Sequence, residues 1–212
     1  MIFLSKTDPF PDINQANKDG VLAIGGDLSP KRLLTAYKNG IFPWYNPGEP
    51  IVWYAPAKRM ILFPTELKVS KSMRQIFRKN VFKLTFNQNF KEVIHHCKTI
   101  TRKDQFGTWI TDEMEEAYIK LHELGIAKSV EVWQDNRLVG GLYGIDLGTV
   151  FCGESMFSLI SNASKTAFIA LSQKLQKENY KLIDCQVYNN HLASLGAREI
   201  PREMFMQILK ER

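Results

Sequence analysis

A lone carboxylate interrupts a segment of apolar and small residues in the second half of the chain. Glu154 lies within FCGESMFS, residues 151–158, which is expected to contain the end of a central strand. A buried charge is costly unless it is paired or hydrogen-bonded. Glu154 is therefore either part of an internal ion pair or placed to hold a cation or an amine.

Residues 182–187, LIDCQV, form a second apolar run, and this run carries two polar side chains. Because side chains alternate across a strand, Asp184 and Gln186 are expected on one face and Cys185 on the other. Polar groups on an interior strand need partners. The two side chains either satisfy each other and the backbone, or they line a cleft that holds a polar substrate.

A proline-stiffened aromatic stretch, GIFPWY at residues 40–45, is followed closely by Trp53 and Tyr54. Loops run over the protein surface. An exposed indole such as that of Trp44 can stack on a nucleobase or grip a partner. The alternative is a small aromatic core beneath the loop.

Three basic residues, Lys71, Arg74 and Arg78, recur at helical spacing within residues 70–79. They are therefore expected on one side of a helix. Such a charged face is usually solvated, but it can also contact phosphates. The formal net charge of +6 and the sequence pI of about 9.2 favour a polyanionic partner.

The elements expected around these residues describe an α+β fold. Strands are expected at residues 51–54, 60–63, 82–86, 130–133, 138–145, 150–153 and 182–187. Helix N-caps are expected at Ser29, Ser70, Thr111 and Asn162. The last four strands predict an antiparallel meander, a long crossover helix after Asn162, and a final central strand.

Composition and absent motifs limit the class of protein. The 212-residue chain is 44% hydrophobic and 24% charged, as is usual for a folded globular protein. Cys97, Cys152 and Cys185 cannot all pair and show no C-x-x-C spacing, which favours buried thiols in a reducing compartment. The sequence has no signal peptide, no apolar stretch of membrane-spanning length, no phosphate-binding glycine loop and no H-E-x-x-H motif. A cytoplasmic protein without a metal site is expected.

Several longer motifs, in order from about residue 10 to the end, resemble the leucyl/phenylalanyl-tRNA–protein transferases. They are GGDLSP (25–30), GIFPW (40–44), GTWI (107–110), SVEVW (129–133), LVGG (138–141), FCGESMFS (151–158), NASK (162–165), LIDCQV (182–187), HLASLG (191–196) and EIPR (199–202). The resemblance implies transfer of Leu or Phe, sometimes Met, from aminoacyl-tRNA to the N-terminal amine of proteins beginning with Arg or Lys. This transfer marks them for N-end-rule degradation. It also implies a small N-terminal α+β domain, residues 1–80, and an N-acetyltransferase-like (GNAT) domain with a mixed sheet, residues 81–212.

The resemblance further implies roles for single residues. Glu154, Asp184 and Gln186 match the family's reaction centre. Trp44 and Trp109 match tryptophans beside the terminal adenosine of the tRNA. Because the tRNA ester is already activated, no cofactor is expected, and a monomer is expected.

The family's pocket for the transferred side chain corresponds to five positions here, Leu142, Met156, Leu171, Leu175 and Ile183. The basic helix with Lys71, Arg74 and Arg78 is expected to contact the acceptor-stem backbone. An acyl-CoA-dependent N-acetyltransferase is the alternative on the same fold. Such enzymes usually carry a glycine-rich pyrophosphate loop, where this chain reads SLISNA, residues 158–163. A non-catalytic binder of RNA or of protein N-termini is the third possibility.

Overall fold

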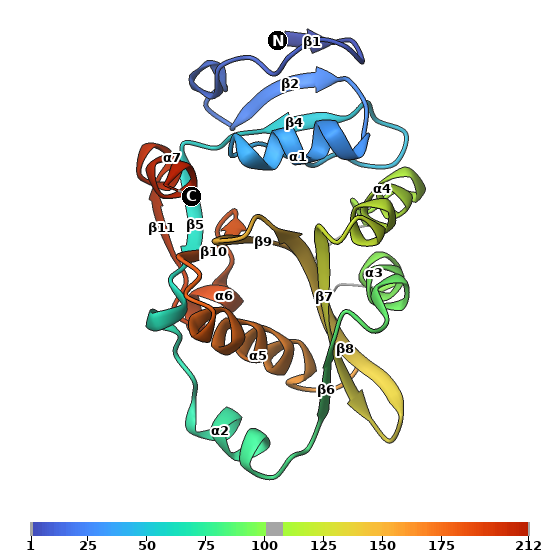
Figure 1. The fold of residues 1–212 in the computed structure, drawn as a ribbon, viewed down its shortest axis with the longest axis vertical. Coiled ribbons are helices and arrows are strands. Elements are labelled where there is room, and N and C mark those ends of the chain that lie inside the picture. The colour runs from blue at the N-terminus through green and yellow to red at the C-terminus, as the bar shows by residue number, and fades with distance from the viewer. Residues whose placement is uncertain (1, 101–107, 212) are drawn as a thin grey trace.

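The chain folds around two β-sheets, of which the smaller lies at the top of Figure 1. The computed structural model describes residues 2–100 and 108–211. The smaller sheet has the strand order β1 (Ile2–Leu4), β2 (Val21–Gly25), β4 (Val52–Tyr54) and β3 (Phe42–Pro43). The larger sheet has the order β11 (Arg198–Pro201), β5 (Lys58–Leu62), β10 (Leu182–Gln186), β9 (Val150–Ser158), β8 (Arg137–Asp146), β7 (Ala127–Gln134) and β6 (Lys83–Phe86). The expected α+β class is confirmed.

The larger sheet is mixed because one helix crosses over it. Strands β6 to β9 are antiparallel neighbours, and α5 (Ala163–Lys177) then returns the chain so that β10 pairs parallel with β9. This is the meander, crossover helix and final strand that the sequence predicted. The start of α5 differs from the prediction in one respect. Asn162 is the N-cap residue with φ of 70°, but its side chain caps nothing, and the Ser158 hydroxyl accepts the Ser164 N–H instead.

Helices cover both faces of the larger sheet, and two apolar cores result. α3 (Phe90–Thr99) and α4 (Asp112–Glu123) pack on one face. α2 (Lys71–Arg78) and α5 pack on the other. The short α6 (Asn190–Ser194) follows β10, and α7 (Arg202–Lys210) follows β11. The two 3₁₀ turns are Ile13–Gln15 and Pro64–Glu66.

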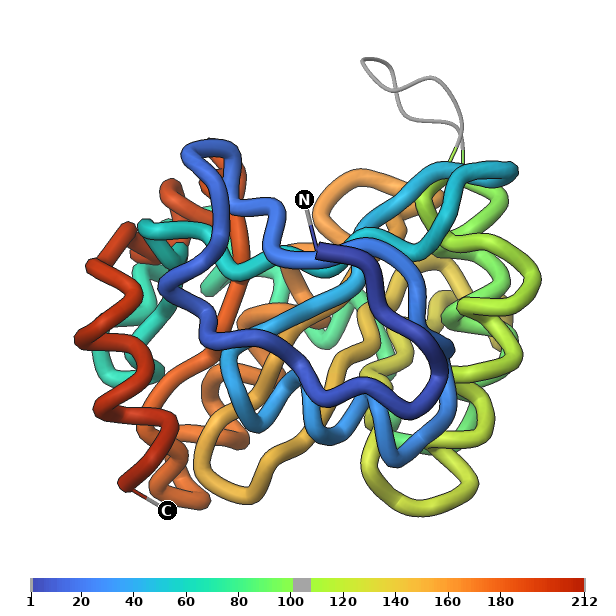
Figure 2. The backbone as a smooth tube through the Cα atoms, turned by 90° about the horizontal axis from the view of Figure 1, so that it is seen from above, coloured from blue at the N-terminus to red at the C-terminus, as the bar shows by residue number. Residues whose placement is uncertain are grey.

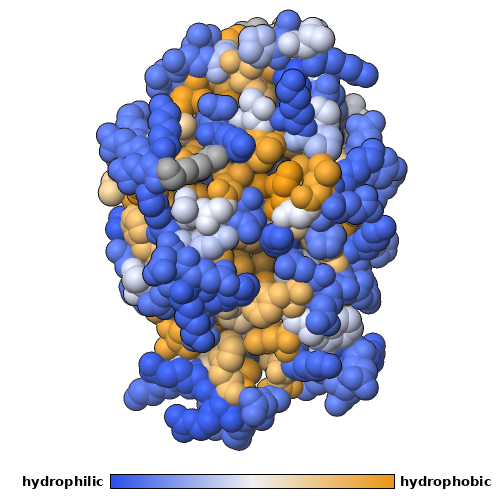
Figure 3. Space-filling model, viewed as in Figure 1, coloured by the Kyte–Doolittle hydropathy of each residue, from blue (hydrophilic) through white to orange (hydrophobic). Residues whose placement is uncertain are grey.

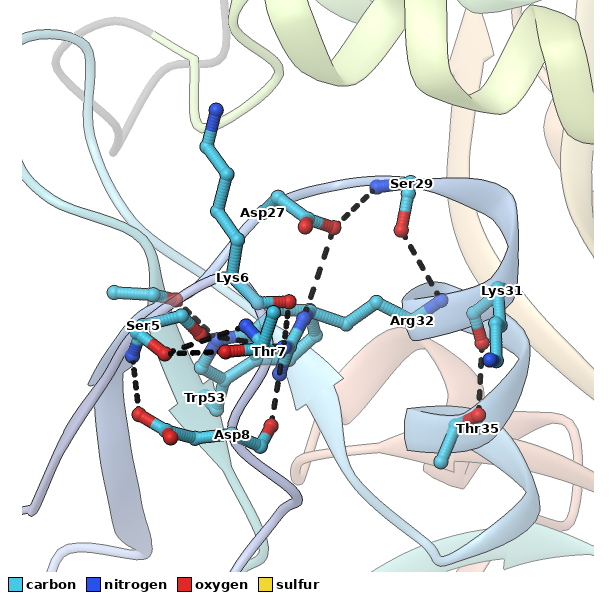
Figure 4. Close-up of polar contacts among 11 residues, drawn as sticks. Ser5, Lys6, Thr7, Asp8, Asp27, Ser29, Lys31, Arg32, Thr35 and Trp53 are labelled. Carbon is cyan, nitrogen blue, oxygen red and sulfur yellow. Dashed lines mark hydrogen bonds and ion pairs between the residues drawn. The ribbon is translucent and has the colours of Figure 1, made fainter.

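The smaller sheet is held to the rest of the molecule by α1 (Pro30–Lys38) and by its N-terminal segment. As predicted, the Ser29 hydroxyl caps α1 by accepting the Arg32 N–H. The Arg32 guanidinium also donates to the carbonyls of Ser5, Lys6 and Asp8, which fixes the first residues over α1 (Figure 4). Figure 2 shows this dark blue segment lying across the top of the molecule.

The division between the two sheets lies between β4 and β5, well before residue 80. β5 pairs with β10 and β11, so it belongs to the larger sheet although it precedes α2. The reason is that its apolar residues Met60, Ile61 and Leu62 are fully buried between strands from the end of the chain. Within the described ranges, no helix has the length and hydropathy needed to cross a lipid bilayer.

Candidate active site

Glu154 occupies a β-bulge in the middle of β9. The register with β8 shifts between Tyr143, opposite Ser155, and Gly144, opposite Gly153, so Glu154 has no partner residue on β8. A bulge bends its strand and re-aims the side chain of the extra residue. The pairing of β9 with β10 is recorded only up to Cys152. Glu154 therefore lies where these two central strands separate.

A second bulge, on β10, places Gln186 beside Glu154. Asp184 pairs with Ile61 and Gln186 with Met60, which leaves Cys185 as the extra residue. Gln186 has φ of 57°, and its backbone N–H donates to Asp184 Oδ1 at 3.0 Å. The predicted alternation is therefore wrong here. Cys185 and Gln186 both line the cavity beside β9, whereas Asp184 points away from it.

Glu154 is held in a hydrogen-bonded group that joins residues from three elements, β10, α4 and α1. Gln186 Nε2 donates to Oε1 at 3.0 Å, and the Tyr118 hydroxyl of α4 donates to Oε2 at 3.0 Å. The Tyr37 hydroxyl of α1 is hydrogen-bonded to that of Tyr118. Burial raises the pKa of Glu154 to about 7, although the hydrogen bonds of Tyr37 and Tyr118 lower it. The carboxyl group therefore changes charge close to neutral pH.

Both tyrosines remain donors at any physiological pH. Burial first, and then the charge of Glu154, raises the pKa of the Tyr37 and Tyr118 hydroxyls well above the ordinary value. Burial likewise raises the pKa of the Cys185 thiol, so this cysteine is not an activated nucleophile. All three cysteines are buried and none of them forms a disulfide, as expected.

Asp184 forms a fully buried ion pair with Arg59 of β5. Arg59 Nε donates to Oδ1 and Nη2 to Oδ2, both at 2.7 Å, and neither side chain is more than 2% exposed. Two parallel N–H···O bonds of this kind fix the carboxylate in one orientation. Asp184 therefore touches the reaction centre only through the backbone of Gln186.

The cavity beside Glu154 and Gln186 has a volume of about 460 Å³. Eight of the residues predicted for the site line it, namely Trp44, Trp109, Leu142, Glu154, Met156, Leu171, Ile183 and Gln186. Asp184 and Leu175 do not line it. Leu175 is buried in the core on the α5 face of the sheet instead. Gly107 of the GTWI motif lies outside the described residues.

The side chains of the aromatic stretch are divided between the core and the cavity. Phe42, Tyr45 and Trp53 are buried in the core beneath the loop, whereas Trp44 remains 39% exposed at the cavity. The cavity thus has aromatic walls from both halves of the chain. On the face of the molecule that Figure 3 shows, apolar side chains run through the middle between hydrophilic margins.

Sequence comparison matches almost the whole chain to one family. Residues 61–210 match the family described as leucyl/phenylalanyl-tRNA protein transferase, and residues 26–57 match its N-terminal domain. A protein of this name from Flavobacterium johnsoniae is 67% identical over 212 residues, covering 100% of both chains. Another from Syntrophus aciditrophicus is 60% identical over 208 residues, covering 98% of this chain and 87% of the relative.

The chain belongs to the leucyl/phenylalanyl-tRNA–protein transferase family. Among solved structures, FemX shares the fold, with a TM-score of 0.54 at 10% identity over 84% of this chain and 70% of FemX. At that identity the likeness concerns the fold alone. The family membership makes the chain an aminoacyltransferase.

The basic helix of this family member contributes no residue to the lining of the cavity. α2 begins after Ser70, whose hydroxyl caps it as predicted, and lies at the bottom of Figure 1, opposite the smaller sheet. Lys71, Arg74 and Arg78 are exposed on it. Within the described part of the chain no carboxylate forms an ion pair with them. They are therefore open to a partner, at a distance from the reaction centre.

Three residues of the site were not predicted from the sequence. Arg59 precedes an apolar strand and belongs to no motif. Asp184 carries the opposite charge inside the apolar run 182–187, which was a signal that Arg59 and Asp184 could pair. Tyr37 and Tyr118 recur at helical spacing with apolar residues, which predicts only buried helix faces for them. Their hydroxyls instead reach across to Glu154, which a helical period alone cannot reveal.

Proposed function

We propose that this protein transfers Leu or Phe, and also Met, from the 3′ end of aminoacyl-tRNA to the N-terminal α-amine of proteins that begin with Arg or Lys. The transfer marks those proteins for N-end-rule degradation, and it takes place in the cytoplasm. The observation that carries the proposal is the hydrogen-bonded pair Glu154–Gln186 in a cavity whose lining includes two tryptophans and several aliphatic side chains.

The cavity offers a different surface to each part of an aminoacyl-adenosine. Trp44 and Trp109 supply aromatic faces on which adenine stacks. Met156, Leu171 and Ile183 form an apolar wall for the side chain of Leu or Phe. The ester between these two parts then lies beside Glu154 and Gln186.

The reaction is aminolysis of an ester that is already activated. The neutral amine attacks the ester carbonyl carbon, a C–N bond forms, and the bond to the ribose oxygen breaks. The proton lost by the amine ends on the released ribose hydroxyl, directly or through the ribose neighbour or a water. The protein therefore contributes mainly position and electrostatics.

Gln186 and Glu154 hold the attacking amine. The amide nitrogen of Gln186 is committed to Glu154. Gln186 Oε1 has no donor among residues 2–100 and 108–211, so it can accept a hydrogen bond from the amine. The ionised carboxylate of Glu154 attracts the amine or the basic first side chain of the acceptor. Asp184 acts by fixing the Gln186 backbone rather than by touching the substrate.

The exposed basic face of α2 binds the acceptor stem. Lys71, Arg74 and Arg78 contact phosphates without reading sequence, as side chains on A-form RNA do. Their place on α2, outside the lining of the cavity, suits a stem whose single-stranded 3′ end reaches the reaction centre.

A transfer assay tests the function directly. Purified protein is mixed with labelled Phe-tRNA or Leu-tRNA and a peptide that begins with Arg, and the labelled peptide is isolated. The matched controls are the same peptide with its amine acetylated and the same peptide beginning with Asp. Transfer to the free Arg peptide alone supports the proposal, whereas no transfer, or equal transfer to the Asp peptide, contradicts it. An added acetyl-CoA sample reports any acetyltransferase activity.

A further inference from the structure

Arg59 is the most completely bonded side chain near the site, and no substrate can reach it. It is 2% exposed, and its guanidinium makes three hydrogen bonds, two to Asp184 and one, from Nη1, to the carbonyl of Gly40 at 3.0 Å. Its two faces are covered by the rings of Phe42 and Phe205, with centroids at 4.6 and 4.8 Å. The guanidinium is therefore held by three hydrogen bonds and by contacts with two aromatic rings.

Through Asp184, Arg59 is connected to the reaction centre. Asp184 Oδ1 accepts from Arg59 and also from the backbone N–H of Gln186. That second bond closes the turn in which Gln186 takes its left-handed φ of 57°, an uncommon conformation for a residue other than glycine. In this conformation the Gln186 amide reaches Glu154. The orientation of Asp184, set by Arg59, thus decides where the Gln186 side chain lies.

Through Gly40 and Phe42, Arg59 is connected to the loop that carries Trp44. Gly40 and Phe42, which contact Arg59, lie two to four residues before Trp44 on the same stretch. The stretch contributes only the two-residue edge strand β3 to the smaller sheet. The Trp44 N–H also donates to the Val52 carbonyl at 2.9 Å, so the stretch is held to β4, and the contacts with Arg59 add its connection to the larger sheet.

We infer that Arg59 is a positioning residue that sets the distance between the Trp44 loop and the Glu154–Gln186 pair. It does this through one planar guanidinium that binds Gly40 on one side and Asp184 on the other. The inference rests on the proposed function, because the two parts it connects are the proposed nucleoside site and reaction centre. Only arginine can make all three bonds at once, since a lysine ammonium lacks the planar fork.

The decisive variant removes both buried charges and keeps the acceptor for Gln186. Arg59→Met combined with Asp184→Asn leaves no unpaired buried charge, and the Asn carbonyl oxygen can still accept the Gln186 N–H. The link to Gly40 and the fixed orientation of residue 184 are lost. We expect kcat to fall roughly 10²-fold, as when reacting groups move by about 1 Å, and KM for 3′-aminoacyl-adenosine to rise several-fold.

A matched pair elsewhere on the same sheet provides the control. Arg198 of β11 binds Glu66 through Nε and Nη2 at 3.1 and 3.2 Å and lies over the Phe63 ring, but both partners are about half exposed. Arg198→Met with Glu66→Gln is expected to leave kcat and KM within twofold of the wild type. Thermal unfolding of all variants shows whether the fold is kept.

The possible results distinguish a failure of the positioning role of Arg59 from a failure of the proposed transfer function. A folded Arg59→Met, Asp184→Asn protein with kcat and KM within threefold of the wild type overturns the role of Arg59. If that protein does not fold, Arg59→Lys decides, because it keeps the charge. A lysine variant with a kcat at least fivefold below the wild type and a raised KM supports the role, and one closer to the wild type overturns it. A wild-type protein that transfers nothing overturns the proposed function, and this role with it.

Discussion

The buried polar chain from Arg59 to Tyr37 and the basic face of α2 use charge in opposite ways. In the buried chain, Arg59, Asp184, Gln186, Glu154 and Tyr118 are joined by hydrogen bonds of 2.7–3.0 Å. On α2, the basic side chains stand in solvent without ion pairs among the described residues. One region depends on exact geometry in a low-dielectric interior, and the other on long-range attraction through water.

This difference predicts how each region responds to change. A buried network is insensitive to salt but fails when one member is lost, because its partners are left unsatisfied. A solvated charged face loses affinity gradually with each charge and weakens with ionic strength. Substitutions in the chain are therefore expected to change kcat, and substitutions on α2 to change binding of tRNA and its salt dependence.

The largest effect is expected from the reaction centre. Glu154→Gln and Gln186→Ala should each lower kcat about 10²–10³-fold, because each removes a group that holds the amine in the transition state. Binding of charged tRNA, measured by filter retention, should change less than threefold. Glu116→Ala, which removes an exposed carboxylate from α4, serves as the control. If the Glu154 and Gln186 variants were as active as the wild type, neither residue would belong to the reaction centre.

The tryptophans at the cavity should give the next largest effect. Trp44→Ala and Trp109→Ala each remove one stacking surface, which is worth roughly 1–3 kcal/mol per base. KM for 3′-aminoacyl-adenosine is therefore expected to rise about 5- to 150-fold. Trp44→Phe keeps an aromatic face and should recover most of the affinity. An unchanged KM in the alanine variants would show that adenine binds elsewhere.

Charge reversal on α2 should give a smaller effect that depends on salt. Arg74→Glu with Arg78→Glu is expected to weaken binding of full-length tRNA about tenfold at low ionic strength. It should also reduce the magnitude of the slope of log affinity against log salt concentration by about 1–2. Each lost phosphate contact removes somewhat less than one unit of that slope. The KM for aminoacyl-adenosine, which has no stem, should stay the same. A slope equal to that of the wild type rejects this face as the stem site.

Much of the scaffold could be predicted from local sequence signals. Ser29, Ser70 and Thr111 cap α1, α2 and α4 as expected, because an N-cap depends only on neighbouring residues. The meander and crossover helix followed from hydrophobic periodicity. The short elements β1, β2, β11, α6 and α7 were not predicted. The strands are stabilised by pairing with other strands, and the short helices by packing rather than by a local pattern.

The site was less accessible to sequence reasoning because it depends on two bulges. Neither the bulge at Glu154 nor that at Cys185 changes the residue pattern, yet each turns a side chain relative to its neighbours. The strict alternation expected for Asp184 and Gln186 failed for this reason. Hydrogen-bond partners of Glu154 from distant segments, such as Tyr118, likewise could not be predicted from the sequence, because only the fold brings them together.

Removing the Tyr118 hydroxyl should give the smallest effect. This effect distinguishes the buried polar chain from the basic face of α2 by its dependence on pH rather than on salt. Its hydroxyl donates to the ionised form of Glu154 and so lowers the pKa of that carboxyl, against the burial that raises it to about 7. Other groups around Glu154 that carry or can carry charge are Tyr37, Tyr143, Cys152, Asp184 and Arg59. Tyr118→Phe removes a donor to the charged form, so the pKa of Glu154 should rise.

The rise follows from the strength of the lost bond. A hydrogen bond to a charged group contributes about 1.5 kcal/mol, which corresponds to roughly one pH unit. Less Glu154 is then ionised at neutral pH, and the acid limb of kcat/KM should move upward by roughly that amount. The ionisation of the acceptor amine is the same in both proteins, so it cancels. Tyr180→Phe, which removes a hydroxyl bonded to Asp146 at 2.8 Å, should leave the profile in place. If both variants keep the wild-type limb, Glu154 does not need to be ionised for transfer.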